Sequence, residues 1–464
     1  MTPARPAAIL AAVLVCACAC ASTGTSTAGS VPPATAASSP LASLGAVPNW
    51  PTYHGDLART GVAAGPAGAF QSAARDWVSG GLDGDVYASP IVAAGLVLVA
   101  TENDTVYAFD AVRGDLRWSR HLATPVDAST LPCGDIRPVS GITGTPVADV
   151  AHGLVYVVAF VRPAQHVLYT LDLAGNVKDS RPVDPPGDSA QVEQERGALT
   201  LSGGTVYVPY GGLAGDCGQY HGWVVGAPAA GGATIAYQVP CHRECGLWAP
   251  GGPTVDSGGD LWVASGNGDS SSTFDYGNAV LRLSPDLKLR DWFAPSDWAS
   301  LNSSDADLGS ISPVLLGNGL VWISGKGGTG YLLRQDQLGH IGGQAATGGA
   351  CSSYAGTAYA AQTLYLACSG EVRAVRVDLA GRAFTTRWRQ SYSGPGAPIL
   401  AGGALWVVET SSGRLLALDP ADGHQRFTYT GGSTAHFATP AVSGDHVYAA
   451  LGRQLVAVRV QVSG

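Results

Sequence analysis

Several polar residues that can act as acids, bases or ligands lie in long loops between positions 190 and 440. His221 and His436 belong to different repeats of the chain, and such a pair could act as a base or bind a metal, although hydrogen-bonded turn histidines are the simpler alternative. No G-x-S-x-G, H-E-x-x-H or Gly-Lys-Ser/Thr pattern occurs, so the sequence indicates no serine nucleophile, zinc hydrolase or phosphate loop. The loop residues expected to face one mouth are Arg196, Gln219, His221, Asp269, Asp305, Tyr354 and His436.

The chain that carries these loops repeats one pattern eight times. Each repeat has a small residue or proline, a short apolar strand, a tight turn rich in Gly, Asp or Asn, and a second apolar strand. The repeats open around positions 90, 146, 199, 253, 313, 358, 398 and 440. This spacing leaves room for four strands per repeat, which predicts an all-β, eight-bladed β-propeller. Seven blades are the alternative if the third or sixth repeat is an insertion.

The two faces of such a propeller are predicted to differ. Turns between first and second strands are short, which indicates a plain structural face. The long segments fall between second and third strands or between blades, and so on the opposite face; they are 211–222, 241–251, 266–278 and 296–309. Loops gathered on one face of a rigid ring are a common place for a binding site.

The first repeat continues into a third strand, a turn and a fourth strand, with Asp110 and Gly114 in the turn and Trp118 on the last strand. Asp and Gly suit this turn because Asp bonds its own backbone and Gly accepts positive φ. The eighth repeat ends too early for a fourth strand. We expect residues 75–78 to supply it, with Trp77 in the place of Trp118, which removes an open sheet edge.

The N-terminus has the composition of an export signal. Residues 1–21 combine Arg5, an apolar run too short to span a membrane and a small-residue cleavage site. Either Cys18 or Cys20 carries a lipid, as in bacterial lipoproteins, or the signal is cleaved and the protein is released. Both alternatives place the protein in the cell envelope or outside the cell.

A linker of small residues, Ser, Thr and Pro is predicted at 22–46, followed by the propeller domain at 47–464. The formal charge of −9 argues against binding to a nucleic-acid backbone. The expected partners are a small molecule, a polymer or a protein at the long-loop face of a monomer.

The cysteines after the linker are even in number, which favours disulfides in an exported chain. Cys351 and Cys368 flank two paired strands of one repeat, so we predict that they are bonded. The other four permit three connectivities, which stay open; they are Cys133, Cys217, Cys241 and Cys245. The 241–245 stretch could also bind a metal, but no second ligand cluster accompanies it.

The repeats resemble those of the pyrroloquinoline-quinone (PQQ)-type propeller family, including the opening WPTYHGDLARTG at 50–61. Four residues match, in order and context, the cofactor pocket of quinoprotein alcohol dehydrogenases. They are Trp248 in GLWAPGG, Asn267 in SGNGD, Asp307 in DADLGSISP and Lys326 in SGKGGTGYLL. Repeats of this kind also occur in non-enzymatic lipoprotein scaffolds, so the fold alone does not fix a function.

The resemblance implies a role for each of the four residues. Trp248 would be the floor on which PQQ stacks, Asn267 a ligand of Ca2+, and Lys326 a contact of the quinone oxygens. Asp307 would be the catalytic base that takes the proton of a hydroxyl-bearing substrate while hydride passes to the quinone. The simpler interpretations are a core aromatic, a turn former, a loop cap and a solvated charge.

The chain also departs from the family pattern. The calcium-binding Glu should fall within 215–223, where Asp216 and Gln219 stand, and the vicinal cysteine pair should fall near Cys133, which has no cysteine neighbour. No C-x-x-C-H occurs, so no covalent haem is expected. Two functions stay open: a PQQ- and calcium-dependent dehydrogenase, or a non-catalytic propeller, released or lipid-anchored, that binds protein or polymer through its long-loop face.

Overall fold

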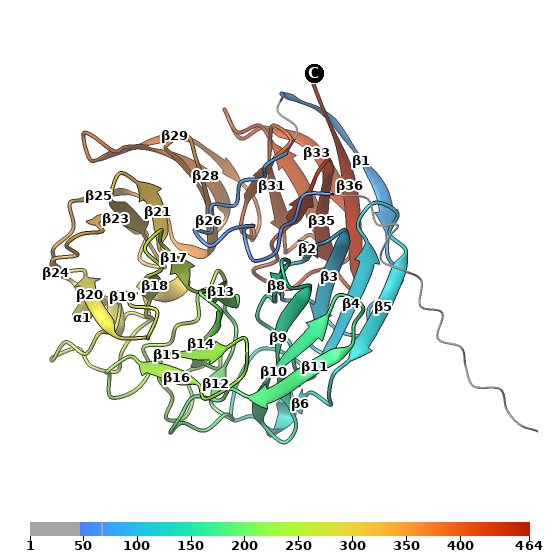
Figure 1. Cartoon of the computed structure of the whole chain (residues 1–464). Coiled ribbons are helices and arrows are strands. Elements are labelled where there is room, and N and C mark those ends of the chain that lie inside the picture. The colour runs from blue at the N-terminus through green and yellow to red at the C-terminus, as the bar shows by residue number, and fades with distance from the viewer. Residues whose placement is uncertain (1–46, 66–67) are drawn as a thin grey trace, which may run out of the picture. The chain divides into compact units, whose positions relative to one another are not determined.

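The computed structural model describes residues 47–65 and 68–464, which form eight sheets, each built on four antiparallel strands and arranged as the blades of a β-propeller (Figure 1). The eight-bladed prediction is confirmed, because the third and sixth repeats each form a complete sheet. The predicted signal at 1–21 and linker at 22–46 lie outside the described residues.

The blades are numbered in chain order, and each is given from its first strand to its last. Blade 1 contains β2 (Ile91–Ala93), β3 (Leu96–Thr101), β4 (Thr105–Asp110) and β5 (Leu116–His121). Blade 2 contains β8 (Val147–Asp149), β9 (Leu154–Val161), β10 (Gln165–Asp172) and β11 (Val177–Pro182). Blade 3 contains β13 (Thr200–Ser202), β14 (Thr205–Gly212), β15 (Trp223–Pro228) and β16 (Ile235–Gln238). Blade 4 contains β17 (Thr254–Val255), β18 (Leu261–Ala264), β19 (Val280–Leu283) and β20 (Leu289–Ala294).

The second half of the ring is built in the same way. Blade 5 contains β21 (Val314–Gly317), β22 (Leu320–Ile323), β23 (Thr329–Arg334) and β25 (Ala346–Gly349). Blade 6 contains β26 (Ser353–Ala360), β27 (Thr363–Cys368), β28 (Glu371–Asp378) and β29 (Ala383–Ser391). Blade 7 contains β30 (Ile399–Ala401), β31 (Ala404–Glu409), β32 (Arg414–Leu418) and β33 (Gln425–Thr430). Blade 8 contains β34 (Ala441–Ser443), β35 (His446–Leu451), β36 (Gln454–Val462) and β1 (Phe70–Val78).

Short elements also occur in the connections. Those between blades are β6 (Val126–Asp127), η2 (Ala128–Thr130), β7 (Val139–Ser140), β12 (Glu193–Gln194), α1 (Trp298–Ser303) and η3 (Leu308–Ser310), and β24 (His340–Ile341) lies between the third and fourth strands of blade 5. β12 extends blade 3 and β24 adds a parallel edge strand to blade 4. Within residues 47–65 and 68–464, no helix is long and apolar enough to cross a membrane.

Burial within each blade follows from position in the ring. First strands of neighbouring blades, such as β2 and β8, contact one another around the axis. Every residue of the second strand β3 is buried, because blades pack against both of its faces, and its sequence is correspondingly apolar except for the terminal Thr101. The fourth strand β5 is mostly exposed and carries charged residues. The core therefore lies between blades.

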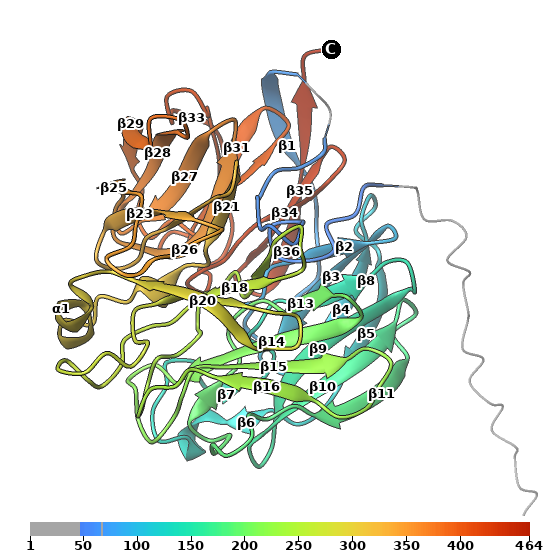
Figure 2. The same cartoon turned by 60° about the vertical axis from the view of Figure 1, so that its left-hand side comes forward.

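The ring closes as predicted, with β1 antiparallel to β36 as the outer strand of blade 8 (Figures 1 and 2). Trp77 on β1 lies against Gly114 in the third turn of blade 1, where a Cβ atom would stand 2.5 Å from the indole. Trp118 meets Gly175 of blade 2 in the same way. A glycine is needed there because the ring of one blade lies directly on the turn of the next.

Two disulfides join described residues. Cys351 and Cys368 are bonded, as predicted. Cys133 and Cys217 are also bonded, which excludes two of the three connectivities that the sequence left open. The remaining two described cysteines, Cys241 and Cys245, carry free thiols.

Candidate functional site

One hollow on the long-loop face collects residues from several blade connections. Its volume is about 190 Å3. Its lining consists of Arg196, 212–216, Trp248, Asp305, Asp307 and Lys326. Three of the four residues matched to a cofactor pocket thus line it. The fourth, Asn267, donates hydrogen bonds to both lining acids, Asp305 and Asp307.

The fold brings these residues together because each follows a strand that ends on the same face. Trp248 lies between β16 and β17, Asn267 follows β18, Asp307 precedes η3, and Lys326 follows β22. They span almost eighty positions in sequence, yet consecutive blades place the ends of their strands side by side.

Trp248 and Asp307 meet across the backbone of Gly266. A Cβ atom at position 266 would lie 2.9 Å from Oδ1 of Asp307 and 3.0 Å from Nε1 of Trp248. Both distances are shorter than ordinary van der Waals contact, so only glycine allows the indole and the carboxylate to approach this closely.

Lys326 forms salt bridges with both acids of the hollow. Its Nζ lies 2.5 Å from Oδ2 of Asp307 and 2.7 Å from Oδ1 of Asp305. The backbone N–H of Asn267 donates to Oδ1 of Asp307 at 2.7 Å, and its side-chain Nδ2 donates to Oδ1 of Asp305 at 3.0 Å. The ammonium also stands 5.4 Å from the ring centroid of Trp248, within cation–π range.

The pKa values of Asp307 and Asp305 are shifted in opposite directions. Burial raises the pKa of Asp307 above its ordinary value, and the opposing effect of Lys326 is smaller. Burial also acts on Asp305, but the hydrogen bonds from Lys326 and Asn267 outweigh it and lower its pKa. For Lys326, burial is outweighed by the two carboxylates, which raise its pKa. Lys326 therefore stays charged, and Asp307 is the more basic of the two acids.

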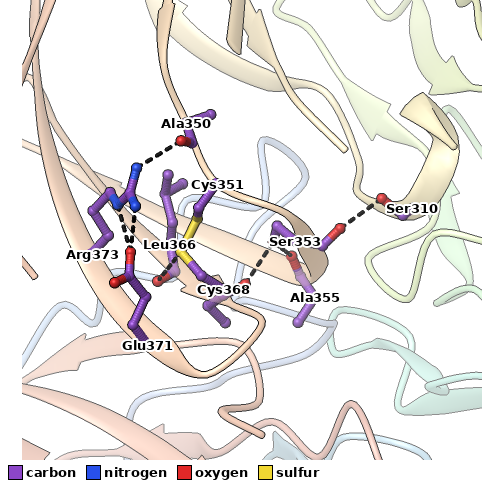
Figure 3. Close-up of a disulfide and its surroundings, with 10 residues drawn as sticks. Ser310, Ala350, Cys351, Ser353, Ala355, Leu366, Cys368, Glu371 and Arg373 are labelled. Atoms are coloured by element: carbon purple, nitrogen blue, oxygen red, sulfur yellow. Dashed lines mark hydrogen bonds and ion pairs between the residues drawn. A yellow bond between two sulfur atoms is a disulfide. The ribbon is translucent and has the colours of Figure 1, made fainter. Parts of the chain in front are cut away.

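The turn that carries Asp307 is held from blade 6. Ser310 in η3 donates to the carbonyl of Ser353 at 2.7 Å (Figure 3). Ser353 in turn donates to the carbonyl of Ala367 at 2.7 Å. The Cys351–Cys368 disulfide lies beside this chain of bonds. A covalent link in one blade thus supports the position of a polar residue contributed by another.

A second group of predicted residues lies next to the hollow. Arg196 lines it and stands 5.7 Å from the ring centroid of Phe437, with Asp135 at 3.4 Å. His436 lies 3.6 Å from the same Asp135 and packs edge-on against Tyr87. Burial, followed by the charge of Arg196, lowers the pKa of His436, so this ring is more readily neutral than a free histidine.

Four other predicted mouth residues lie elsewhere. His221 is buried, with Nδ1 2.8 Å from Asp188 and Nε2 3.0 Å from the carbonyl of His242. Gln219 donates to that same carbonyl, and Asp269 lies 2.8 Å from the ring of His242. Tyr354 is 37% exposed on blade 6. His221 and His436 therefore have separate partners and do not form the pair that their loops suggested.

The structure also reveals buried acids that the sequence did not single out. Glu102, Asp104 and Glu195 are 2%, 0% and 4% exposed. Oε2 of Glu102 accepts the N–H of Gly141, and Oε2 of Glu195 accepts the N–H of Gly144. Burial raises the pKa of Glu102 to about 7 and that of Asp104 to about 9. An acid in a strand-to-strand turn is ordinarily solvated, so no local signal indicated this burial.

The oxygen ligands available at the hollow do not suit a calcium ion. Oδ1 of Asn267 is buried without a partner among the described residues, as an available ligand would be. Ca2+ takes six to eight oxygens, however, and the carboxylates of Asp305 and Asp307 are already engaged by Lys326 and Asn267. Across 47–65 and 68–464, no three His, Cys, Asp or Glu side chains are grouped to hold a metal.

The hollow is also small for a tricyclic quinone. Pockets that take ligands of that size measure about 300 Å3 or more, whereas this one measures about 190 Å3. The residues expected around the quinone, an aromatic face with a lysine and a carboxylate, are present. The set of residues expected to bind the metal is incomplete.

Comparison with solved structures shows the same fold in proteins of different function. A quinohemoprotein alcohol dehydrogenase from Comamonas testosteroni is 16% identical, with a TM-score of 0.68 over 89% of this chain and 80% of that one. A europium-containing methanol dehydrogenase is 12% identical, with a TM-score of 0.67 over 89% and 98%. BamB from Moraxella catarrhalis is 14% identical, with a TM-score of 0.57 over 85% and 99%. At these identities the likeness establishes the fold alone.

No curated protein matches the sequence. A family model described as outer membrane protein assembly factor BamB matches residues 72–214 and 344–463, which is more than half of the chain. With eight closed blades and the opening repeat already described, this chain belongs to that family of PQQ-type propeller repeats.

Proposed function

We propose that the protein is a binding propeller that holds a small hydroxyl-bearing molecule in the hollow at Trp248. One observation carries this proposal: Trp248, Asp307, Lys326 and Arg196 come from separate blade connections and line a single hollow. Stabilising the individual loops would not require these residues to line a common hollow.

The lining suits hydroxyl groups in particular. The carboxylates of Asp305 and Asp307 accept O–H hydrogen bonds, Arg196 and Lys326 donate, and the indole of Trp248 can pack on the C–H face of a ring. A volume of about 190 Å3 holds roughly six water molecules. The ligand is therefore a triol or one sugar unit, either free or at the end of a polymer or glycosylated partner on the long-loop face.

Binding is tested by saturation-transfer NMR and calorimetry with glycerol, myo-inositol and glucose. We expect at least one of these probes to bind, and Trp248→Ala and Asp307→Asn to weaken it tenfold or more. Tyr354→Ala and Asp269→Asn are matched controls, because they remove an aromatic ring and a charge away from the hollow. Equal affinity in all four variants would contradict the proposal.

A PQQ-dependent dehydrogenase is the second candidate, with Asp307 as the base and Trp248, Asn267 and Lys326 around the cofactor. The observation that favours it is the buried Oδ1 of Asn267, which has no hydrogen-bond partner in the described part of the chain. The solved neighbours include dehydrogenases, one of them containing europium. Since the donors do not fit calcium, we derive no catalytic step.

Reconstitution decides between the two candidates. The protein is mixed with PQQ and either CaCl2 or EuCl3, and cofactor absorbance, europium luminescence and dye-linked oxidation of glycerol are followed. Our proposal expects no PQQ binding at high micromolar concentration. Saturable PQQ binding that Lys326→Met abolishes, together with oxidation that Asp307→Asn abolishes, would establish the dehydrogenase instead.

Export with lipid attachment is part of the same proposal and rests on residues 1–21 alone. Labelling of growing cells with an alkyne fatty acid should mark the wild-type protein, and either Cys18→Ser or Cys20→Ser should remove the label. Unlabelled protein in the culture medium would indicate simple secretion.

A further inference from the structure

The irregular segment 241–246 lies between the loops of blades 3 and 4 and is anchored to both through Glu244. Glu244 makes a parallel bridge with His221 on one side and an antiparallel bridge with Gly268 on the other. This segment therefore joins the long loop of blade 3 to the long loop of blade 4, although it belongs to neither sheet.

The same segment holds the backbone of two residues of the candidate site. The N–H of Cys245 donates to the carbonyl of Asn267 at 2.6 Å. The carbonyl of Gly246 accepts the N–H of Gly266 at 2.9 Å, and Trp248 follows two residues later. A change in the position of Cys245 would thus be transmitted to Asn267 and to Trp248.

The two thiols of this segment face the same turn. Sγ of Cys241 lies 3.6 Å from the carbonyl oxygen of Glu244, and Sγ of Cys245 lies 3.9 Å from that of Arg243. Both cysteines pack in the same apolar cluster of blades 3 and 4. Among the described cysteines they are the pair left over once the two disulfides are assigned.

Cys241 and Cys245 differ in accessibility. Cys245 is fully buried, and burial, together with its hydrogen bond to Cys241, raises its pKa. A buried thiol of this kind reacts slowly with a dissolved oxidant. Cys241 is partly exposed. The pair therefore has one accessible thiol and one sheltered thiol that can act only on its neighbour.

The backbone of this turn is also under strain. Glu244 and Cys245 have φ of 75° and 55°, in the left-handed region that residues with a side chain rarely adopt. Two consecutive residues of this kind persist only when surrounding bonds hold them. A covalent link across the turn would supply such a constraint.

We propose that Cys241 and Cys245 form a reversible disulfide that locks the 241–246 segment against Asn267 and fixes the shape of the hollow. Its consequence for ligand binding rests on the function proposed above. Its formation and its effect on the backbone do not, so the two proposals can fail separately.

The oxidant is a low-molecular-weight disulfide such as oxidised glutathione. The thiolate of Cys241 attacks one sulfur of this disulfide, forming a mixed disulfide and releasing one thiolate. Cys245 then loses its proton and attacks the sulfur of Cys241, which releases the second thiolate. Two protein thiols give up two electrons and two protons, and one glutathione disulfide becomes two glutathione thiols.

The first test is peptide mapping of the full chain after incubation with oxidised glutathione and alkylation without reductant. We expect a cross-linked species containing both 241 and 245, which dithiothreitol converts to two alkylated cysteines. Recovery of both residues alkylated in the oxidised sample would overturn the proposal. This measurement needs only the wild-type protein.

The second test is hydrogen–deuterium exchange of the oxidised wild type, Cys241→Ser and the Cys241→Ser/Cys245→Ser double variant. We expect the amides of 244–246 and 266–268 to exchange at least fivefold faster in both variants, whereas β31 in blade 7 stays unchanged. Equal exchange at these amides would show that the disulfide does not lock the site. Faster exchange in every blade would show general destabilisation and contradict a local role.

Discussion

At the residue scale, the Asp305–Lys326–Asp307 network fixes the donors and acceptors of the hollow in the free protein. A ligand would meet a site whose polar groups already have their orientation, so little side-chain entropy remains to be lost on binding. The same network explains why a dication does not fit: the lysine already neutralises one of the two acids.

Gly266→Ala tests how closely Trp248 and Asp307 must approach. The added methyl would lie 2.9 Å from Oδ1 of Asp307 and 3.0 Å from Nε1 of Trp248. We expect loss of ligand binding and a fall of about 1–3 kcal/mol in the free energy of unfolding, as for other overpacked sites. Urea denaturation and calorimetry measure both effects. Gly81→Ala is the control, because a Cβ at position 81 meets nothing within 4 Å.

The raised pKa of the buried Asp104 predicts that the free energy of unfolding depends on pH. Burial raises its pKa from the ordinary value near 4 to about 9, so the folded protein keeps a proton that the unfolded chain loses. This contribution to stability is complete below about pH 4 and disappears as the pH rises through about 9. Urea unfolding at pH 5 and pH 9 should therefore show lower stability at pH 9.

Asp104→Asn isolates this contribution, since an amide does not titrate. The fall in stability between pH 5 and pH 9 should be smaller in the variant than in the wild type. Asp115→Asn, at an exposed turn position of the same blade, should show the same fall in stability as the wild type. An equally steep fall in Asp104→Asn would show that other groups cause the pH dependence.

At the scale of elements, a blade is stabilised mainly by its neighbours. β3 is buried on both faces and β5 is mostly exposed, yet Trp118 on β5 still reaches the turn of blade 2 at Gly175. The outer strands β1 and β5 therefore each contribute an aromatic ring to the next blade, and these adjacent blades are coupled at the rim as well as at the core.

Trp77→Ala tests this coupling at the closing strand. The indole is only partly buried, so we expect a loss of about 2 kcal/mol, less than the 3–5 kcal/mol typical of a fully buried Trp. Arg75→Ala on the same strand is exposed and should change stability by less than about 0.5 kcal/mol. Equal midpoints of urea unfolding in the two variants would contradict the contact between Trp77 and Gly114.

At the scale of the whole molecule, a strand from the N-terminal part of the chain completes the blade formed by the C-terminal part. Without β1, the backbone groups of β36 would form an open edge that pairs readily with other chains. Ring closure is therefore a property of the complete domain and not of any single repeat.

Deletion of residues 1–78 should give dimers and larger aggregates that the full chain does not form, as measured by size-exclusion chromatography with light scattering. Deletion of residues 1–46, which keeps β1, should leave a monomer. A monomeric protein with unchanged thermal stability after the longer deletion would show that β1 is dispensable.

The architecture could be predicted from the sequence because its signals are local. Alternating apolar strands and turn glycines recur in each repeat, Trp77 precedes them in the role of Trp118, and Cys351 and Cys368 flank adjacent strands. The positions of the long loops indicated one functional face, and the resemblance to quinoprotein alcohol dehydrogenases added Trp248, Asn267, Asp307 and Lys326 to it. All of these depend on neighbours within a repeat or on the regular spacing of repeats.

The tertiary structure alone decided which polar groups are buried and which residues share a cavity. Asp104 is shielded from solvent because the segment around Gly141, beyond the end of its own blade, covers it. His221 contacts Asp188 and does not line the hollow. The bond between Cys133 and Cys217 likewise joins two blades. Burial and pairing of this kind depend on side chains far away in sequence, so no local pattern determines them, whereas strand period and turn chemistry determine the ring.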